Sequence, residues 1–112
     1  MMYEPKSEVY KALKSLNYDV VHANSAEFTK LPLITFSVIS NIPQYALDCD
    51  VLSQDVSVSI DLWAEDSKEL TKMLFEVESC MRSILYILEF SSEVPNVDKN
   101  ILHYTTRFRK TV

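Results

Sequence analysis

The segment DVSVSIDLWAEDSKELTKMLFEVESCMRSIL, residues 55–85, contains a strand pattern that runs directly into a helix pattern. Residues 55–63 alternate between an apolar row and a second row that is mainly polar. The apolar row is Val56, Val58, Ile60 and Leu62, and the second row is Ser57, Ser59, Asp61 and Trp63. This alternation predicts an antiparallel strand with one buried face.

The rest of the segment predicts a helix over 66–85. Asp66, with Glu69 three residues later, matches the capping box that is typical of a helix N-terminus. Apolar residues then recur at helical spacing, and charged or small polar residues occupy the opposite side. The apolar stripe consists of Leu70, Met73, Leu74, Val77, Met81, Ile84 and Leu85.

Further strands and one more helix are predicted on either side of this segment. Residues 5–16 have an apolar stripe at helical spacing, with Pro5 at the first position, and Asn17 tolerates the left-handed conformation that ends a helix. Residues 18–22 and 33–40 are predicted as strands before the segment, and residues 86–90 and 101–110 as strands after it. Residues 41–54, which include Pro43, are predicted to form a long connection of a kind that is usually functional or mobile.

The predicted order of elements is therefore α-β-β-β-α-β-β. Each strong strand has a single apolar face, so two helices on one face of a mostly antiparallel sheet would bury every apolar stripe. The sequence thus predicts a two-layer α+β fold. A chain of 112 residues suits one hydrophobic core, and we expect residues 1–112 to form a single domain.

The composition excludes several classes of enzyme. The chain contains no glycine, so it cannot form the glycine-rich turns of a P-loop or of a dinucleotide-binding site. It also lacks the glycine-flanked elbow that presents the nucleophilic serine of α/β-hydrolases. Nucleotide-dependent enzymes and α/β-hydrolases are therefore poor candidates.

The soft and imidazole ligands are scattered along the chain. His22, Cys49, Cys80 and His103 are the only histidines and cysteines, and no two lie within four residues of each other, whereas zinc ligands usually occur in closely spaced pairs. We therefore predict no metal site, no cofactor and no catalytic residue. One alternative stays open, which is a small ligand-binding or enzymatic domain that uses Cys49, His22 or His103.

The sequence contains no membrane-spanning segment. The longest uncharged stretch, Leu31 to Leu47, carries several polar residues and two prolines, and the N-terminus lacks an apolar signal region. We therefore expect a protein that stays in the compartment where it is made. A net charge of −5 also opposes general binding to nucleic acid.

Charge is divided unevenly along the chain. Residues 31–67 contain no Lys or Arg, whereas residues 99–112 contain four cationic side chains and no carboxylate side chain. The first region includes Asp48, Asp50, Asp55 and Asp61, and the second includes Arg107 and Arg109. Copies of such a chain can meet head to tail, because unlike surfaces attract. Alternatively, Asp61 pairs with Arg107 or Arg109 within one sheet, which would contribute about 0.2–1 kcal/mol.

Trp63 is predicted on the sheet face that the helices leave uncovered, because it shares the parity of the polar row. It either closes the rim of the core or anchors a protein interface, where Trp is enriched among the residues that dominate binding. The predicted interface residues are Asp48, Asp50, Asp55, Asp61, Trp63, Arg107 and Arg109.

Three segments together carry a resemblance to a known family. They are the motif Pro32–Phe36, the strand Val56–Ala64 running straight into the capped helix 66–85, and the terminal strand His103–Phe108. The chain resembles the tail terminator, or tail completion, proteins of long-tailed bacteriophages, which are also described as head–tail joining or minor capsid proteins. The similarity spans nearly the whole chain and lies in the order of elements and the hydrophobic pattern.

This resemblance implies a non-enzymatic structural protein of a phage or prophage. Such proteins assemble as a ring, typically of six copies, that caps the tail tube and offers a docking surface to the connector of the head. DNA passes through the lumen as cargo, and the acidic connection 41–54 is expected to line the lumen or contact the next subunit. The implied location is the head–tail junction of the virion, and the host cytoplasm during assembly. The alternative within this class is a head-side stopper or adaptor.

Overall fold

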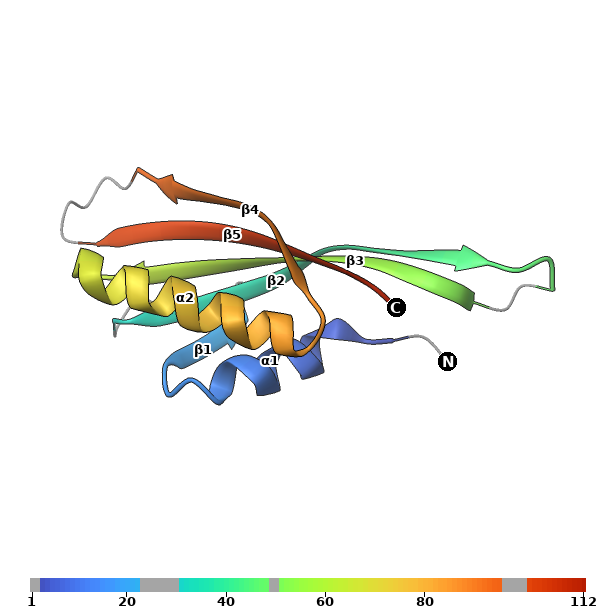
Figure 1. Cartoon of the computed structure of the whole chain (residues 1–112), viewed down its shortest axis with the longest axis horizontal. Helices are drawn as coiled ribbons and strands as arrows, with labels where there is room; N and C mark the ends of the chain where they lie inside the picture. Colours follow the sequence, from blue (N-terminus) through green and yellow to red (C-terminus); the bar gives the residue numbers. More distant parts are fainter. Residues whose placement is uncertain (1–2, 23–30, 49–50, 96–100) are drawn as a thin grey trace.

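The computed structural model describes residues 3–22, 31–48, 51–95 and 101–112. Its elements are α1 (Pro5–Lys14), β1 (Asp19–His22), β2 (Leu33–Tyr45), β3 (Val51–Ala64), α2 (Ser67–Ser83), β4 (Ile87–Val94) and β5 (Leu102–Thr111). Both helices lie on one side of a five-stranded sheet (Figure 1). The predicted α+β class and the predicted order of elements are therefore confirmed.

The helices begin and end where local side-chain chemistry allows. The Glu4 carboxylate accepts hydrogen bonds from the backbone N–H groups of Lys6 and Ser7, and the Asp66 carboxylate accepts one from Lys68. Asn17 has φ 64° after α1, as predicted for a residue that replaces glycine there. The prediction for Leu85 is wrong: it has φ 72° beyond the end of α2 and is exposed instead of joining the apolar stripe.

The sheet has the strand order β1-β2-β3-β5-β4. The short β1 runs parallel to β2, and the remaining neighbours are antiparallel. The longest pairings place β3 in the centre, with Ile60 opposite Phe36 on β2 and Thr106 on β5. This arrangement brings the acidic strand β3 directly beside the cationic strand β5.

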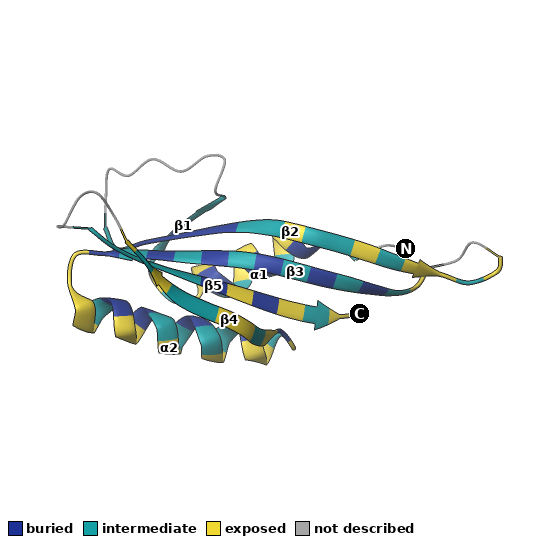
Figure 2. Ribbon diagram, turned by 90° about the horizontal axis from the view of Figure 1, so that it is seen from above, coloured by how far each residue is buried: buried dark blue, intermediate teal, exposed yellow. Residues whose placement is uncertain are grey.

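The core lies between the helices and one face of the sheet. The apolar row of β3 is fully buried there, together with Ile34, Phe36 and Phe108 from the neighbouring strands. Val9 and Leu13 of α1 and Met73, Val77 and Met81 of α2 cover these residues. The burial colours in Figure 2 alternate along β3 accordingly. Neither described helix packs on the second face of the sheet, here called the open face.

The predicted connection 41–54 is wrong. β2 and β3 continue past the predicted strand ends at Ser40 and Asp55, and they form a long hairpin that projects beyond the helices (Figure 1). We call residues 39–48 and 51–54 the hairpin arm. The molecule measures 54 × 24 × 21 Å as a result. The period-two pattern fades in the arm because neither described helix covers it, so burial against a helix does not select apolar residues there.

Pro43 is compatible with this extended strand. It lies opposite Gln54, on a part of β2 where the described residues of β1 no longer pair, because β1 reaches only from Leu33 to Phe36. Proline lacks a backbone donor, and an edge strand can tolerate this loss. The ladder has two register shifts: Ile39 is the extra residue on β2 between Val38 and Ser40, and Leu52 is the extra residue on β3 opposite Gln44 and Tyr45.

Candidate protein–protein interface

The open face brings together most of the predicted interface residues. Asp55, Asp61 and Trp63 occupy alternate positions on β3, and Arg107 and Arg109 occupy alternate positions on β5. Asp48 lies at the described tip of the hairpin arm instead, and it is exposed. Asp50 and Cys49 lie outside the described residues. The predicted set is therefore divided between the sheet and the arm.

One end of the open face carries an aromatic cluster. The indole of Trp63 stacks on the imidazole of His103, with ring centroids 3.6 Å apart and planes 12° apart, and the two residues are direct neighbours across β3 and β5. The Trp63 Nε1–H donates a hydrogen bond to the hydroxyl of Thr35 at 3.2 Å. His103 Nε2 lies 3.0 Å from Asp61 Oδ1. Three adjacent strands are thus joined by side chains on this face.

The side chains of this cluster stack on one another and form hydrogen bonds within the sheet. The Trp63 indole N–H and the His103 Nε2 both have partners in the cluster, and Thr35 is itself buried. Aromatic pairs of this kind add about 0.5–1.5 kcal/mol beyond the area that they bury. His103 was not predicted as the partner of Asp61, because the register of β3 against β5 cannot be read from composition.

The predicted pairing of Asp61 with Arg107 or Arg109 is wrong. Asp61 contacts His103, and Arg109 instead forms an ion pair of 3.6 Å with Asp55, whose carboxylate also accepts a hydrogen bond from Thr111 at 2.8 Å. The physical reason is the register: Asp61 lies opposite Thr105, and Asp55 lies opposite Thr111. Arg109 lies opposite Ser57, two positions from Asp55 and four from Asp61, so it reaches Asp55.

The neighbouring edge of the open face is apolar and cationic. Ile87 and Phe90 of β4 lie opposite Arg109 and Arg107, respectively, and both apolar side chains are exposed. Arg107 is exposed as well, and within the described parts of the chain it forms no ion pair. The strand 86–90 was predicted from its apolar residues, but their exposure was not. Exposed apolar groups beside arginines are typical of protein interfaces.

The hairpin arm carries a second set of exposed apolar side chains. This set consists of Ile39, Ile42, Tyr45, Leu47 and Leu52. Monomeric soluble proteins rarely expose contiguous apolar patches of large extent, and such patches mark interaction sites. The acidic residues of this region pointed to an interface, whereas its apolar residues follow no periodic pattern and were not predicted to be exposed.

A polar network fixes the root of the hairpin arm to the N-terminus. Gln54 is buried; its amide oxygen accepts a hydrogen bond from the Tyr3 N–H at 2.7 Å, and its Nε2 donates to the Tyr3 carbonyl and to Asn41 Oδ1. Residues far apart in sequence therefore hold the arm at a defined position on the body. Nothing in the local sequence around Gln54 indicated this role.

The same network continues into a charged pair. Lys110 Nζ donates to Glu8 Oε1 at 2.8 Å, and the Tyr3 hydroxyl donates to the same oxygen at 2.7 Å. Burial disfavours the charged form of Glu8, but the hydrogen bonds from Lys110 and Tyr3 and the Lys110 charge outweigh it and lower the pKa of Glu8. Burial, followed by the hydrogen bonds to Tyr86 and Glu8, raises the pKa of Tyr3.

The two described residues of the enzymatic alternative, His22 and His103, do not converge. His22 on β1 is separated from His103 on β5 by β2 and β3, and its ring contacts Phe36 edge-on. Cys80 lies between the helices, where its thiol donates to the Ala12 carbonyl at 3.0 Å, and burial raises its pKa. A raised pKa disfavours the reactive thiolate. Across the described ranges, no three His, Cys, Asp or Glu side chains are grouped so that they could hold a metal ion.

Neither described helix is both long and apolar enough to cross a bilayer. No protein-family model matches the chain, and a search of curated proteins found no significant match. The resemblance to phage tail terminators therefore stays a prediction from the sequence pattern.

Proposed function

We propose that this protein is a structural subunit that assembles with copies of itself, and that its assembly is a ring that completes the tail of a long-tailed phage or prophage. In this proposal the protein acts by fitting its neighbours and transforms no substrate. The observation that carries the proposal is the hairpin arm, which extends past the core and exposes apolar side chains with no described segment of the same chain over them.

Two further features support self-assembly. The open face carries a polar and acidic half on β2 and β3 and a cationic half on β5, so one molecule presents two unlike surfaces. Unlike surfaces on one subunit produce head-to-tail contacts, and such contacts close into rings when the rotation between subunits permits. The arm and the open face lie at different places on the molecule, as a head-to-tail contact requires.

The proposed partners follow from the resemblance. They are the tail tube protein on one side of the ring, a connector or head-completion protein on the other, and DNA as cargo in the lumen. The proposed location is the head–tail junction of the virion, and the host cytoplasm during assembly. An acidic lumen would suit passage of DNA, because like charges prevent adhesion to the wall.

The test uses phage tails that lack their terminator. Purified protein added to such tails should make them competent to join heads, and the protein should be retained on one tail end. A tail preparation without added protein is the control. If the tails stay incompetent and bind no protein, the tail role is wrong. Restoration of heads that lack a stopper, with no effect on the tails, would assign the protein to the head side instead.

A further inference from the structure

We propose that the hairpin arm of one copy docks into a groove at the β4–β5 end of a second copy. This proposal rests on the self-assembly part of the proposed function, and it does not depend on the phage tail. We call the acceptor the β4–β5 groove. It is lined by Leu85, Ile87, Glu89, Arg109, Lys110 and Thr111.

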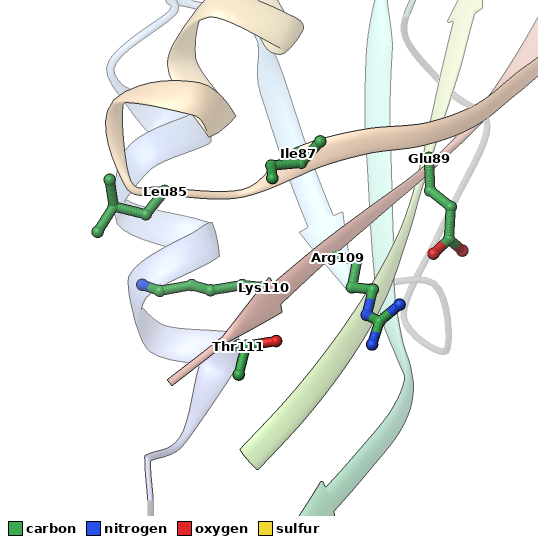
Figure 3. Close-up of a pocket in the computed structure, with 6 residues that line it drawn as sticks. All are labelled: Leu85, Ile87, Glu89, Arg109, Lys110 and Thr111. Carbon is green, nitrogen blue, oxygen red and sulfur yellow. The ribbon is translucent and has the colours of Figure 1, made fainter. Parts of the chain in front are cut away.

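The β4–β5 groove has space for an apolar side chain. Its volume is about 500 Å³, and Figure 3 shows Leu85 and Ile87 on the β4 side and the side chains of β5 on the other. Leu85 and Ile87 are 74% and 72% exposed, so a large part of their apolar surface faces solvent. The positive φ of Leu85 directs the chain out of α2 at this point and leaves its side chain beside the groove.

The hairpin arm supplies matching apolar groups. Leu47 at the tip is fully exposed, and Tyr45 and Leu52 are 59% and 71% exposed. Burial of such groups at an interface removes apolar area from water on both partners. Aromatic and aliphatic anchors of this kind dominate binding when a pocket accepts them.

Charge favours the same pairing. The arm carries Asp48 and, in sequence, Asp50, and residues 31–67 contain no Lys or Arg. The groove carries Arg109 and Lys110 with Glu89 as its carboxylate, and the exposed Arg107 lies next to it on β5. Arg109 and Lys110 already have partners in Asp55 and Glu8, so Arg107 is the main cation that remains for the incoming arm. Complementary charge then fixes the orientation of the arm.

The geometry of the hairpin excludes the arm of the same copy. Asp55 lies opposite Thr111, so β3 leaves the groove end of the sheet at this pair and continues outward as the arm. The paired strands β2 and β3 extend straight away from that point, and the tip cannot return to it without breaking the ladder between them. The occupant of the groove is therefore the arm of a second copy.

The test separates donor from acceptor in the purified full chain. Leu47→Asp places a charge on the arm, and Ile87→Asp places a charge in the groove. Each variant should raise the dissociation constant of self-association about tenfold or more. Analytical ultracentrifugation up to millimolar concentration measures this constant. A mixture of the two variants should recover association, because one intact arm then meets one intact groove. Phe75→Asp, at an exposed aromatic residue on α2, is the matched control and should change nothing.

Three outcomes would overturn the proposal. They are a native protein that stays monomeric at millimolar concentration, an Ile87→Asp variant that associates as the native chain does, and a mixture that does not associate. Circular dichroism of each variant shows whether the fold is kept.

A second test reverses charge, with Arg107→Glu in one variant and Asp48→Lys in another. Each single reversal should weaken association, and mixing the two should restore it. Failure in the tail assay with this association intact would refute the phage role alone.

Discussion

The covered part of the β2–β3 hairpin and the hairpin arm have the same backbone pairing but opposite side-chain environments. Beneath the helices, Ile60 is fully buried against the core, whereas Ile42 on the arm is 53% exposed. Backbone hydrogen bonds thus continue where the hydrophobic core ends. The core therefore holds the covered half, while the arm depends on the backbone ladder and on a few polar contacts at its root.

The largest expected effect is a difference in the free energy of unfolding between variants at Ile60 in the core and at Ile42 on the arm. Ile60→Ala should lower the free energy of unfolding by about 2–5 kcal/mol, because it leaves a cavity in the core. Ile42→Ala, the matched control on the arm, should change it by less than about 0.5 kcal/mol. Urea unfolding followed by circular dichroism measures both. Equal losses would show that the arm shares the core.

The root of the hairpin arm should give the next effect. Gln54→Leu removes the three hydrogen bonds to Tyr3 and Asn41 and takes these partners from the partly buried backbone groups of Tyr3. The expected loss is about 1–3 kcal/mol, because an unsatisfied buried group incurs its full desolvation cost. Hydrogen exchange should rise at the arm and at the N-terminus together. Protection that falls in only one of them would contradict the coupling.

The aromatic cluster tests the open face of the covered half. His103→Ala should lower the free energy of unfolding by about 0.5–1.5 kcal/mol, because it removes the stacking partner of Trp63. Trp63 is the only tryptophan, so its fluorescence reports the loss of the stack directly. Arg107→Ala on the same strand is the control. An unchanged emission spectrum in His103→Ala would mean that the rings do not stack in solution.

The smallest expected effect is a pH dependence at Glu8. Because the pKa of Glu8 is lowered in the folded state, the unfolded state binds the proton more readily, and folding loses stability as the pH falls through the folded pKa. The contribution is fully present above the ordinary glutamate pKa of about 4.3. It amounts to about 1 kcal/mol or less, because Glu8 is partly exposed and screened by solvent.

Glu8→Gln measures this contribution. The variant should be less stable than the native chain at neutral pH, and the difference should shrink as the pH is lowered below about 4. Glu65→Gln, at an exposed residue, is the control. A difference that stays constant from neutral to acid pH would show that the Lys110 contact does not depend on the Glu8 charge.

Side-chain periodicity was enough to predict the covered half. The strand from Val56 and the helix after Asp66 each have one apolar face against the core. Burial of that face requires apolar residues at the period of the element, so the period is visible in the sequence. The turn at Asn17 was predictable for a local reason, since few residues accept a positive φ. The open face of β3 was predicted by the same parity, and Asp61 and Trp63 do lie on it.

The arm and the contacts of the site were not predictable in this way. The arm is held by backbone hydrogen bonds, which any residue except proline can donate, so its sequence carries little trace of them. The partners of Asp61 and Arg109 depend on register. Tyr86, which contacts Tyr3, and Lys110, which contacts Glu8, lie 83 and 102 residues away in the sequence. Such contacts arise only once the chain is folded.

The continuity of β3 has a mechanical consequence. A single strand of 14 residues runs from the centre of the sheet into the arm, and its pairing with β2 is shifted on the β3 side only at Leu52, near the tip. The arm is therefore joined to the covered sheet by one unbroken strand and by the contacts of Gln54 at its root. In the proposed assembly, a contact made at Leu47 would be transmitted along β3, so that the arm would help to set the angle between neighbouring copies.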